Sequence, residues 1–262
     1  MDLNLSGKYA LVCGSTQGIG KAVAIELALL GANVILLARN EEKLKKVLGE
    51  LQQSKEQKHS YITADFSDSM QLKEKIEKYI KEHPVIHILV NNTGGPPAGT
   101  ALGATVSEFL QAFNNHLVCN HILVQSLVSG MKGAGYGRII NIISTSVKQP
   151  IPGLGVSNTI RAAVGNWSKT LAGELAPFKI TVNNVLPGAA NTIRLQSIFE
   201  NKAQKNGKKV EEIKSEMIAE IPAGRIAEPN EVANAVAFLA SPAAAYITGI
   251  NIPVDGGRTL CL

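Results

Sequence analysis

The stretch Gly14-Ser15-Thr16-Gln17-Gly18-Ile19-Gly20 decides the fold of this chain of 262 residues. It follows an apolar run and opens an amphipathic segment, so its three glycines stand between a predicted strand and a predicted helix. Backbone amide groups at the positive end of that helix can meet a pyrophosphate, and the glycines allow its close approach. The stretch therefore predicts a dinucleotide-binding loop, with an ordinary tight turn as the alternative.

Strands and helices alternate along the rest of the chain, which is typical of a parallel sheet with crossover helices. The predicted strands are 9–13, 34–38, 60–64, 86–91, 138–143, 180–185 and 250–254. The predicted helices lie near 19–30, 41–54, 69–82, 107–131, 156–176 and 229–240. This order predicts an α/β fold over residues 1–262: a single-domain, doubly wound Rossmann fold with a seven-stranded parallel sheet and helices on both faces.

Composition excludes several classes of protein. The chain is 45% hydrophobic, but its apolar segments are short and interrupted by charge, so we expect no membrane-spanning helix. Cys13, Cys119 and Cys261 are too few and too scattered for a disulfide framework or a tetrahedral metal site, so we expect no metal. The first residues lack the basic and apolar regions of a secretory signal, and a cytoplasmic location is therefore expected.

The net charge of +5 is concentrated in two lysine-rich stretches, 43–58 and 202–214, which also contain glutamates. We interpret both stretches as solvated helix faces. A nucleic-acid-binding surface would have aromatic residues among the basic ones, and these stretches contain none. We therefore expect no nucleic-acid partner, while an acidic protein such as an acyl carrier remains open as a partner.

The residues after the second predicted strand bear on the choice of nucleotide. A site selective for NAD places Asp or Glu there to accept a hydrogen bond from the ribose 2′-hydroxyl, but this chain has Ala38 and Arg39. A carboxylate would repel a 2′-phosphate, whereas a guanidinium can bind it through paired charged hydrogen bonds. The position favours NADP(H) over NAD(H), with a plain surface arginine as the alternative.

Further motifs follow the later strands: Ala64-Asp65-Phe66, Asn91-Asn92-Thr93-Gly94, and Pro187-Gly188 with Thr192. Together with the glycine loop and the ending Val254-Asp255-Gly256-Gly257, they resemble the short-chain dehydrogenase/reductase family over essentially the whole chain. The resemblance is strongest to its branch of 3-oxoacyl-acyl-carrier-protein reductases. It implies a nucleotide-dependent oxidoreductase.

The resemblance also assigns the residues that hold the cofactor. It implies that Asp65 and Phe66 flank the adenine, although Asp65 could instead cap a helix beginning near Ser69. The full set of expected cofactor contacts is Gly14, Ser15, Gln17, Gly18, Ile19, Gly20, Arg39, Asp65, Phe66, Asn92, Thr93, Gly94, Arg161, Pro187, Gly188 and Thr192.

The catalytic set departs from the family pattern. The family uses a Ser that orients the substrate carbonyl, a Tyr that donates a proton, a Lys that assists the Tyr, and a supporting Asn. Ser144 matches the Ser, but the family spacing leads to Ser157 and Arg161 at the Tyr and Lys positions. A serine hydroxyl is shorter and much less acidic than a phenol, so we do not expect Ser157 to replace the Tyr directly. Arg161 can still bind ribose hydroxyls.

The supporting Asn position falls on His116, directly after Asn114 and Asn115, and a shifted register would restore Asn115. His116 could donate or relay a proton if its helix faces the site. The alternative is a helix histidine that hydrogen-bonds to nearby backbone and has no chemical role.

Residues 192–220 are predicted to form a helical lid over the substrate. Its apolar residues could face the substrate, but we favour their packing within the protein: Ile193, Leu195, Ile198, Phe199, Met217 and Ile218. The resemblance further implies a homo-oligomer, a tetramer or dimer formed through the helices near 107–131 and 156–176 and the last strand.

Two hypotheses about function follow. In the first, the chain is an atypical NADP(H)-dependent oxidoreductase of a carbonyl or alcohol substrate, with a non-standard proton donor and with 3-oxoacyl thioesters as one candidate substrate class. In the second, it is a catalytically weak or silent nucleotide-binding protein that serves as a sensor or partner subunit. A water-rich site with His116 and Ser144 facing the nicotinamide favours the first hypothesis, and a filled pocket favours the second.

Overall fold

Seven parallel strands form the centre of the molecule, in a computed structural model that describes residues 1–54, 56–83 and 85–261. Their order in the sheet is β3-β2-β1-β4-β5-β6-β7. The strands are β1 (Tyr9–Cys13), β2 (Asn33–Ala38), β3 (Ser60–Thr63), β4 (Ile88–Asn91), β5 (Gly137–Ile142), β6 (Ile180–Pro187) and β7 (Asn251–Val254). β1 lies between β2 and β4, so the strand order reverses beside it. The predicted doubly wound fold is confirmed.

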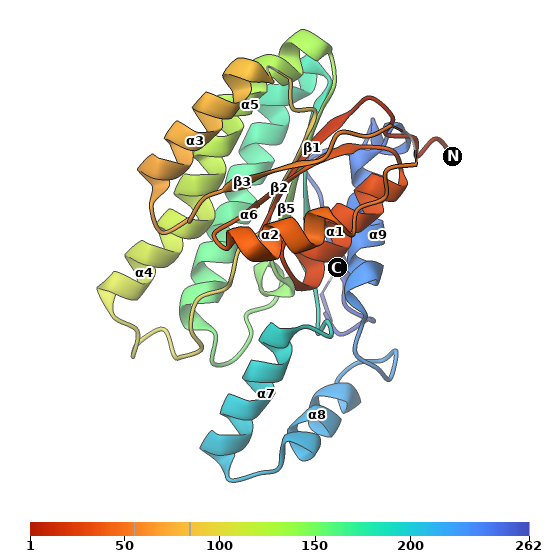
Figure 1. Ribbon diagram of the computed structural model, residues 1–262. Coiled ribbons are helices and arrows are strands. Elements are labelled where there is room, and N and C mark those ends of the chain that lie inside the picture. The colour runs from red at the N-terminus through yellow and green to blue at the C-terminus, as the bar shows by residue number, and fades with distance from the viewer. Residues whose placement is uncertain (55, 84, 262) are drawn as a thin grey trace.

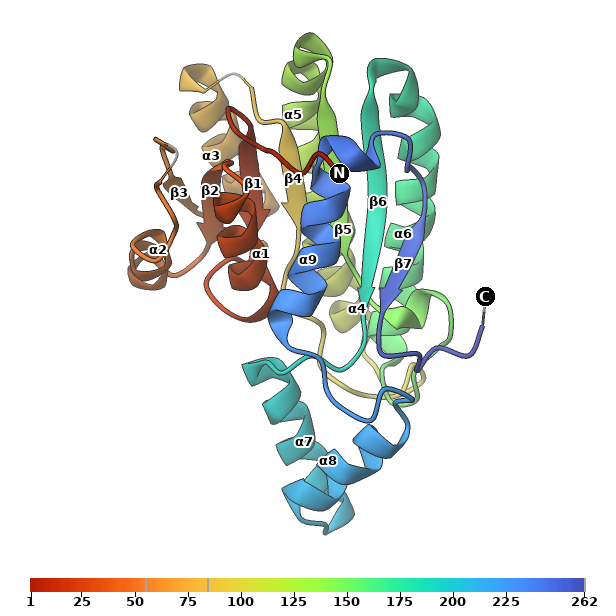
Figure 2. The same ribbon diagram turned by 90° about the vertical axis from the view of Figure 1, so that its right-hand side faces the viewer.

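Helices cover both faces of the sheet (Figures 1 and 2). One face packs against α1 (Gly18–Leu29), α2 (Glu41–Leu48) and α9 (Pro229–Ala240). The other packs against α3 (Ser69–Glu82), α5 (Cys119–Ala134) and α6 (Gly155–Leu175). The inner strands are buried on both sides and are accordingly rich in Val, Ile and Leu.

The helix predicted near 107–131 contains a change of helical pitch. It begins as α4 (Val106–Phe113), passes through a π turn over Asn114–Val118, and continues as α5. Thr105 and Glu108 form a capping box at its start, and Gly135 in the left-handed conformation follows its end. A π turn accommodates one extra residue per turn, so it changes which side chains face the sheet edge.

Two further helices, α7 (Ile193–Asn206) and α8 (Val210–Ala219), project beyond the carboxyl ends of the strands (Figures 1 and 2). They have a small hydrophobic cluster of their own, formed by Ala189, Leu195, Phe199, Ala203, Ile213 and Ile221. The two ends of this segment meet in an isolated bridge between Ala190 and Ala227, closed by Asn191 N donating to Ala227 O at 2.8 Å.

No helix among the described residues has the length and apolar character needed to cross a membrane.

Candidate active site

A cavity of about 780 Å³ opens at the carboxyl ends of the strands, where the strand order reverses. In doubly wound folds this is the place where ligands bind. The cavity brings together most of the residues expected from the sequence: Gly14, Gln17, Gly18, Ile19, Arg39, Asp65, Phe66, Asn92, Thr93, Gly94, Ser144, Ser157, Arg161, Pro187, Gly188 and Thr192. Ser15, Gly20 and His116 are expected site residues that lie outside its lining.

The glycine loop is closely packed against the end of β4. Gly14 and Gly18 have φ values of +59° and +54°, which favour glycine. A Cβ on Gly14 would lie 2.7 Å from the Asn92 side-chain nitrogen, and a Cβ on Gly20 would lie 2.2 Å from the Gly14 carbonyl oxygen. Gly20 therefore supports the loop rather than lining the cavity.

The start of α1 is suited to an anion. Gln17, at the N-cap of this helix, makes no side-chain hydrogen bond to its first turn, so that turn receives no cap from this residue. Gln17 and Gly18 both line the cavity. Amide groups at a helix start and the absence of a Cβ beside them fit the pyrophosphate of a dinucleotide.

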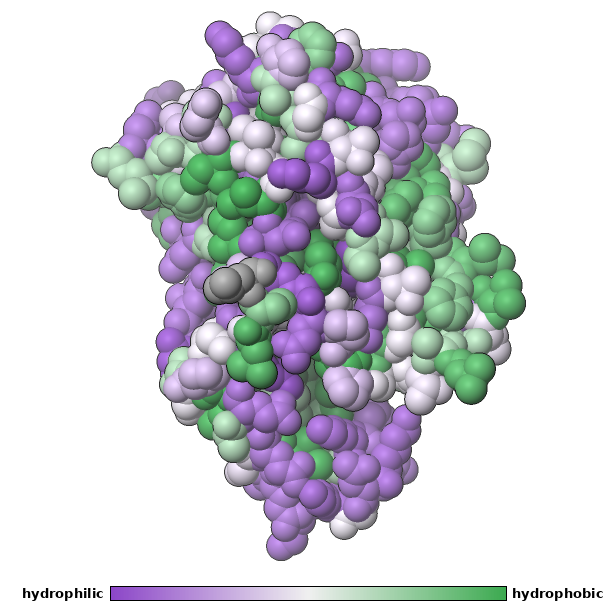
Figure 3. All heavy atoms as spheres, turned by 180° about the vertical axis from the view of Figure 1, so that it is seen from behind, coloured by the Kyte–Doolittle hydropathy of each residue, from purple (hydrophilic) through white to green (hydrophobic). Residues whose placement is uncertain are grey.

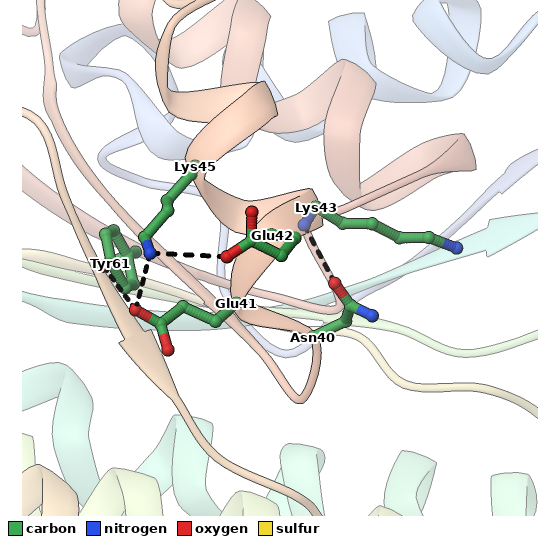
Figure 4. Close-up of polar contacts among 6 residues, drawn as sticks. All are labelled: Asn40, Glu41, Glu42, Lys43, Lys45 and Tyr61. Carbon is green, nitrogen blue, oxygen red and sulfur yellow. Dashed lines mark hydrogen bonds and ion pairs between the residues drawn. The ribbon is translucent and has the colours of Figure 1, made fainter.

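Arg39 lies at the rim of the cavity with 80% of its side chain exposed. It forms one ion pair, with Asp65 at 3.9 Å. The neighbouring acids are held elsewhere: Lys45 Nζ lies 3.1 Å from Glu41 and 3.4 Å from Glu42 (Figure 4). Neither glutamate lines the cavity, so the guanidinium of Arg39 is the charged group that an approaching 2′-phosphate would meet first.

The hydrogen bonds after β2 and β3 separate binding residues from helix caps. Asn40 caps α2 by accepting a hydrogen bond from Lys43 N at 2.9 Å (Figure 4). α3 is capped by Asp68, which accepts from Gln71 N at 2.9 Å. Asp65 instead accepts from Ser67 N at 2.9 Å. The alternative that Asp65 caps α3 is therefore wrong, and its carboxylate lies at the cavity.

Ser144 follows β5 and lines the cavity, and its oxygen accepts a hydrogen bond from Ser146 N at 3.1 Å. That bond uses a lone pair and leaves the hydroxyl hydrogen available to a ligand. Ser157 and Arg161, one turn apart on α6, also line the cavity. The structure thus brings together three of the four side chains that the sequence singles out around the reacting group, and His116 is the exception.

Arg161 is a buried cation with incomplete hydrogen bonding. Its side chain is 8% exposed, Nη1 donates to the Ile142 carbonyl at 3.0 Å, and Nε has no partner. Burial, and then the nearby charge of Arg194, lower the pKa of Arg161 to about 10. The group keeps its positive charge at neutral pH, in surroundings where a charge acts strongly on its neighbours.

His116 does not have the surroundings expected of a proton donor. It is 2% exposed, and its imidazole hydrogen-bonds to the backbone of Gly94. Burial, and then the charge of Arg161, lower its pKa to about 2, so the ring is neutral at physiological pH. These contacts match the alternative interpretation, a helix histidine bonded to nearby backbone.

Asn115 lines the cavity in place of His116. It lies in the π turn, and with its amide oriented to satisfy its neighbours its nitrogen donates to Phe66 O at 2.8 Å. The extra residue of the π turn has the effect of the shifted register considered from the sequence. The two adjacent asparagines before His116 are the signal that could have indicated it.

Arg194 is a cavity residue that sequence reasoning missed. It lies in the first turn of α7, and its Nη2 donates to the Pro96 carbonyl at 2.6 Å. A single arginine in a lysine-rich segment has no distinguishing pattern. Its place two residues after Thr192, whose side chain caps α7, is the available signal.

The apolar residues of the 192–220 segment divide between two roles. Ile193 and Ile198 line the cavity, and Ile193 is 66% exposed. Phe199 is 3% exposed and packs with Ile213 and Met217 inside the segment's own cluster. The favoured interpretation, packing, holds for Phe199 and Met217, whereas Ile193 and Ile198 face the space that a substrate would enter.

The sequence matches a protein family and individual known proteins over most of its length. A family model described as enoyl-(acyl carrier protein) reductase matches residues 14–259. The NADPH-dependent reductase BacG of Bacillus subtilis (strain 168) is 31% identical over 254 residues, which cover 97% of this chain and 98% of that protein. The 3-oxoacyl-[acyl-carrier-protein] reductase FabG of Haemophilus influenzae is 34% identical over 259 residues, 98% of this chain and 100% of that protein.

Solved structures of related reductases have the same fold as this chain. YwfH, an NADPH-dependent reductase involved in bacilysin biosynthesis, superposes with a TM-score of 0.92 at 30% identity and covers 98% of this chain and 100% of its own. L-Sorbose reductase from Gluconobacter frateurii, solved with NADPH and L-sorbose, superposes with a TM-score of 0.93 at 30% identity over 100% of both chains.

Proposed function

The chain belongs to the short-chain dehydrogenase/reductase family, and we propose that it is an NADPH-dependent reductase of carbonyl compounds. One observation carries the proposal: a single open cavity is lined by the glycine loop, Ser144, Ser157 and Arg161. The protein leaves open the space beside these side chains. In a silent nucleotide-binding subunit, other side chains could fill that space. The open cavity with Ser144 in its lining favours turnover, whereas His116, the other residue expected to face the nicotinamide, lies outside the lining.

The preference for NADPH over NADH rests on Arg39 and on the relatives. Arg39 stands where an acid selective for NADH would stand, and Glu41 and Glu42 are engaged by Lys45. BacG is an NADPH-dependent reductase, and the L-sorbose reductase structure was solved with NADPH. When bound, the nicotinamide supplies the hydride.

The chain's own residues would orient the substrate and stabilise the charge that develops on it. Ser144 donates its free hydroxyl hydrogen to the substrate carbonyl oxygen. Arg161 holds a positive charge in a buried position at the same cavity, where it stabilises negative charge on that oxygen. Ser157 and Arg161 would occupy the positions of the family's Tyr and Lys.

The route of the proton differs from the family pattern. Ser157 is smaller than a tyrosine, and it lines the open cavity, so a water molecule fits beside it where the phenol would be. We assign proton delivery to that water: it gives a proton to the negatively charged substrate oxygen, and bulk solvent returns a proton to it through the open cavity. Ser157 hydrogen-bonds to this water, while the hydroxyl hydrogen of Ser144 goes to the substrate oxygen. Loss of a general acid costs about 10²- to 10⁴-fold in rate, so a slow reductase is expected.

The test combines binding and turnover in one preparation. NADPH and NADH are titrated by fluorescence, and NADPH oxidation is then followed against 3-oxoacyl thioesters and simple ketones. We expect tighter binding of NADPH and slow, steady turnover of part of the panel. NADPH binding with no turnover of any carbonyl compound contradicts the reductase. Binding of neither nucleotide contradicts both the reductase and a nucleotide-binding role.

Ser144→Ala tests the assigned role of the hydroxyl. We expect kcat/KM to fall by about 10²-fold, because the donor to the carbonyl oxygen is lost. The NADPH dissociation constant should change by less than about threefold, since Ser144 is not placed at the pyrophosphate or the 2′-phosphate. Ser126→Ala is the matched control, because its hydroxyl bonds within α5 to Ile122 O. Equal effects of the two variants would exclude a role for Ser144 in the reaction.

We propose in addition that α7 and α8 form the substrate lid. Ile193 and Ile198 contribute an apolar wall to the cavity, and Arg194 joins the segment to the loop after β4 through Pro96. Small carbonyl compounds and acyl thioesters both fit an apolar wall of this kind. The substrate panel therefore includes both classes.

A further inference from the structure

Two arginines face the cavity without a carboxylate to neutralise them. Arg161 and Arg194 both line it, and neither forms an ion pair with any residue in the part of the chain that the structure describes. Their protein contacts are backbone carbonyls: Ile142 O for Arg161 at 3.0 Å and Pro96 O for Arg194 at 2.6 Å. A carbonyl oxygen satisfies one donor of a guanidinium but not its charge.

The two guanidinium groups approach the same point in space. A Cβ built on Gly95 would lie 3.3 Å from Nη2 of Arg194 and 3.9 Å from Nη2 of Arg161. Gly95 has no side chain and also lines the cavity, so the space beside both nitrogens is left open. Two like charges this close repel each other, and the repulsion contributes to the lowered pKa of Arg161.

The protein supplies no counter-charge at this end of the cavity. Asp65 is the one carboxylate among the described residues that line it, and it is paired with Arg39 on the adenine side. Arg161 is more than nine-tenths buried and its Nε lacks a partner, which is costly unless a ligand compensates it. Ribose hydroxyls of the cofactor, the contact expected of Arg161, could satisfy that nitrogen but not the charges of the two arginines, so the uncompensated charge and the open space point to a bound anion.

The position of Arg194 separates this anion from the phosphates of the cofactor. Thr192 lies against the glycine loop, since a Cβ on Gly18 would come within 3.1 Å of its Cγ2. Two residues later, Arg194 reaches the loop after β4 instead, at Gly95 and Pro96. The pyrophosphate is expected at the glycine loop and the 2′-phosphate at Arg39, so neither accounts for Arg194.

We propose that the substrate is a carbonyl compound that carries a free carboxylate, held by Arg194 beside Gly95, with the positive charge of Arg161 adding to the attraction from the other side of Gly95. The planar fork of a guanidinium matches a carboxylate through two parallel hydrogen bonds. Ser144 lies at the same cavity, so the carboxylate would hold the carbonyl group near its hydroxyl. This inference rests on the proposed reductase function and names its substrate class.

The first experiment needs no turnover. Oxamate, malonate and benzoate are titrated by calorimetry into the complex of the full-length protein with NADP⁺, and sodium chloride and inorganic phosphate are titrated as further anions. We expect at least one carboxylate to bind, and we expect Arg194→Met to raise its dissociation constant by about 10- to 100-fold. Lys202→Met is the matched control, because it removes one positive charge from the same helix outside the cavity. Gly95→Ala should also weaken carboxylate binding, since the added methyl group fills the space between the two guanidinium groups.

Each contrary result has a defined meaning. If no carboxylate binds, or if Arg194→Met and Lys202→Met weaken it equally, the proposal is overturned. Tighter binding of inorganic phosphate than of every carboxylate overturns it in favour of a phosphate ester. A fall of more than tenfold in NADPH affinity in Arg194→Met would assign this arginine to the cofactor and also overturn the proposal.

The second experiment separates this proposal from the function on which it rests. Turnover is compared for acetoacetate and 2-oxohexanoate, each against its methyl ester. We expect kcat/KM to favour the acids by at least about tenfold, and Arg194→Met to reduce that ratio towards one while Arg194→Lys restores part of it. Equal turnover of acids and esters contradicts the carboxylate but supports the reductase. Carboxylate binding without turnover of any carbonyl compound contradicts the reductase and leaves the anion site supported.

Discussion

Arg39 shows how much one exposed side chain can decide. Its guanidinium is 80% exposed and makes one ion pair, at 3.9 Å, so little within the protein competes for it. We expect Arg39→Ala to raise the dissociation constant of NADPH by about tenfold or more, because charged hydrogen bonds to the 2′-phosphate are lost. The dissociation constant of NADH should change by less than about twofold. Fluorescence titration of both nucleotides measures the ratio. A parallel loss for NADPH and NADH would mean that Arg39 does not contact the 2′-phosphate.

His116 predicts how stability depends on pH. Its pKa is about 2 in the folded protein and near 6.5 when exposed, so between these values only the unfolded state binds the proton. Stability from this group is therefore complete above pH 6.5 and decreases as the pH falls, by about 2 kcal/mol at pH 5. His116→Asn should show a weaker loss of urea stability between pH 7.5 and 5 than the natural protein. The exposed His83→Asn is the control, and an unchanged acid dependence in His116→Asn would contradict the prediction.

Individual residues also show where sequence reasoning ends. The glycine loop, Arg39 and Ser144 could be placed because each directly follows a recognisable strand, and strand ends share one edge of the sheet. His116 was placed through a count along a regular helix, and the π turn over Asn114–Val118 changes that count. Arg194 lies on a segment whose position depends on tertiary packing rather than on a local pattern.

At the scale of elements, the contact between α1 and the glycine loop leaves no room for a side chain. A Cβ on Gly20 would lie 2.2 Å from Gly14 O, so Gly20→Ala must displace the helix from the loop. We expect Gly20→Ala to lower the free energy of unfolding by about 1–3 kcal/mol and to raise the dissociation constant of NADPH by at least about tenfold. Urea unfolding and nucleotide titration measure the two effects.

Gly173 provides a matched control within another helix. It lies exposed in α6, where a Cβ would meet nothing within 4 Å. Gly173→Ala should therefore raise the free energy of unfolding by up to about 1 kcal/mol, because alanine favours a helix over glycine. Similar destabilisation by both substitutions would contradict the packing argument for Gly20.

Element boundaries were less predictable than element order. The helix predicted over 41–54 ends at Leu48, directly before Gly49, where a glycine disfavours continuation. The strand predicted over 86–91 begins at Ile88. Apolar periodicity locates an element, but its ends depend on caps and on hydrogen bonds to neighbours that periodicity does not contain.

At the scale of the whole molecule, one side of α4 exposes apolar side chains to solvent. Val106, Leu110 and Phe113 recur along one side of α4 and are 74%, 65% and 43% exposed, and Leu102 nearby is 99% exposed. Green atoms gather at the right-hand edge of Figure 3, on the side where α4 lies. Patches of this kind mark interfaces, and they support the prediction of a homo-oligomer that includes this helix.

Light scattering after gel filtration tests the assembly. We expect the natural chain to have the mass of a dimer or tetramer, and Val106→Asp with Leu110→Asp to shift it to a smaller species, because two charges would be buried at the contact. Met70→Asp, on α3, is the control, since it places the same charge at another apolar residue that is 64% exposed. A monomeric natural chain would show that the predicted oligomer is wrong.

The bridge between Ala190 and Ala227 has a consequence for how such enzymes diverge. It joins the two ends of the α7–α8 segment shortly after the end of β6, and the segment packs around its own cluster of apolar residues. Insertions, deletions or exchange in the part of this segment that follows Arg194 need not alter the strands, the glycine loop or Ser144. Through the proposed lid, natural selection can therefore change what the protein recognises while the strands and the glycine loop are inherited intact.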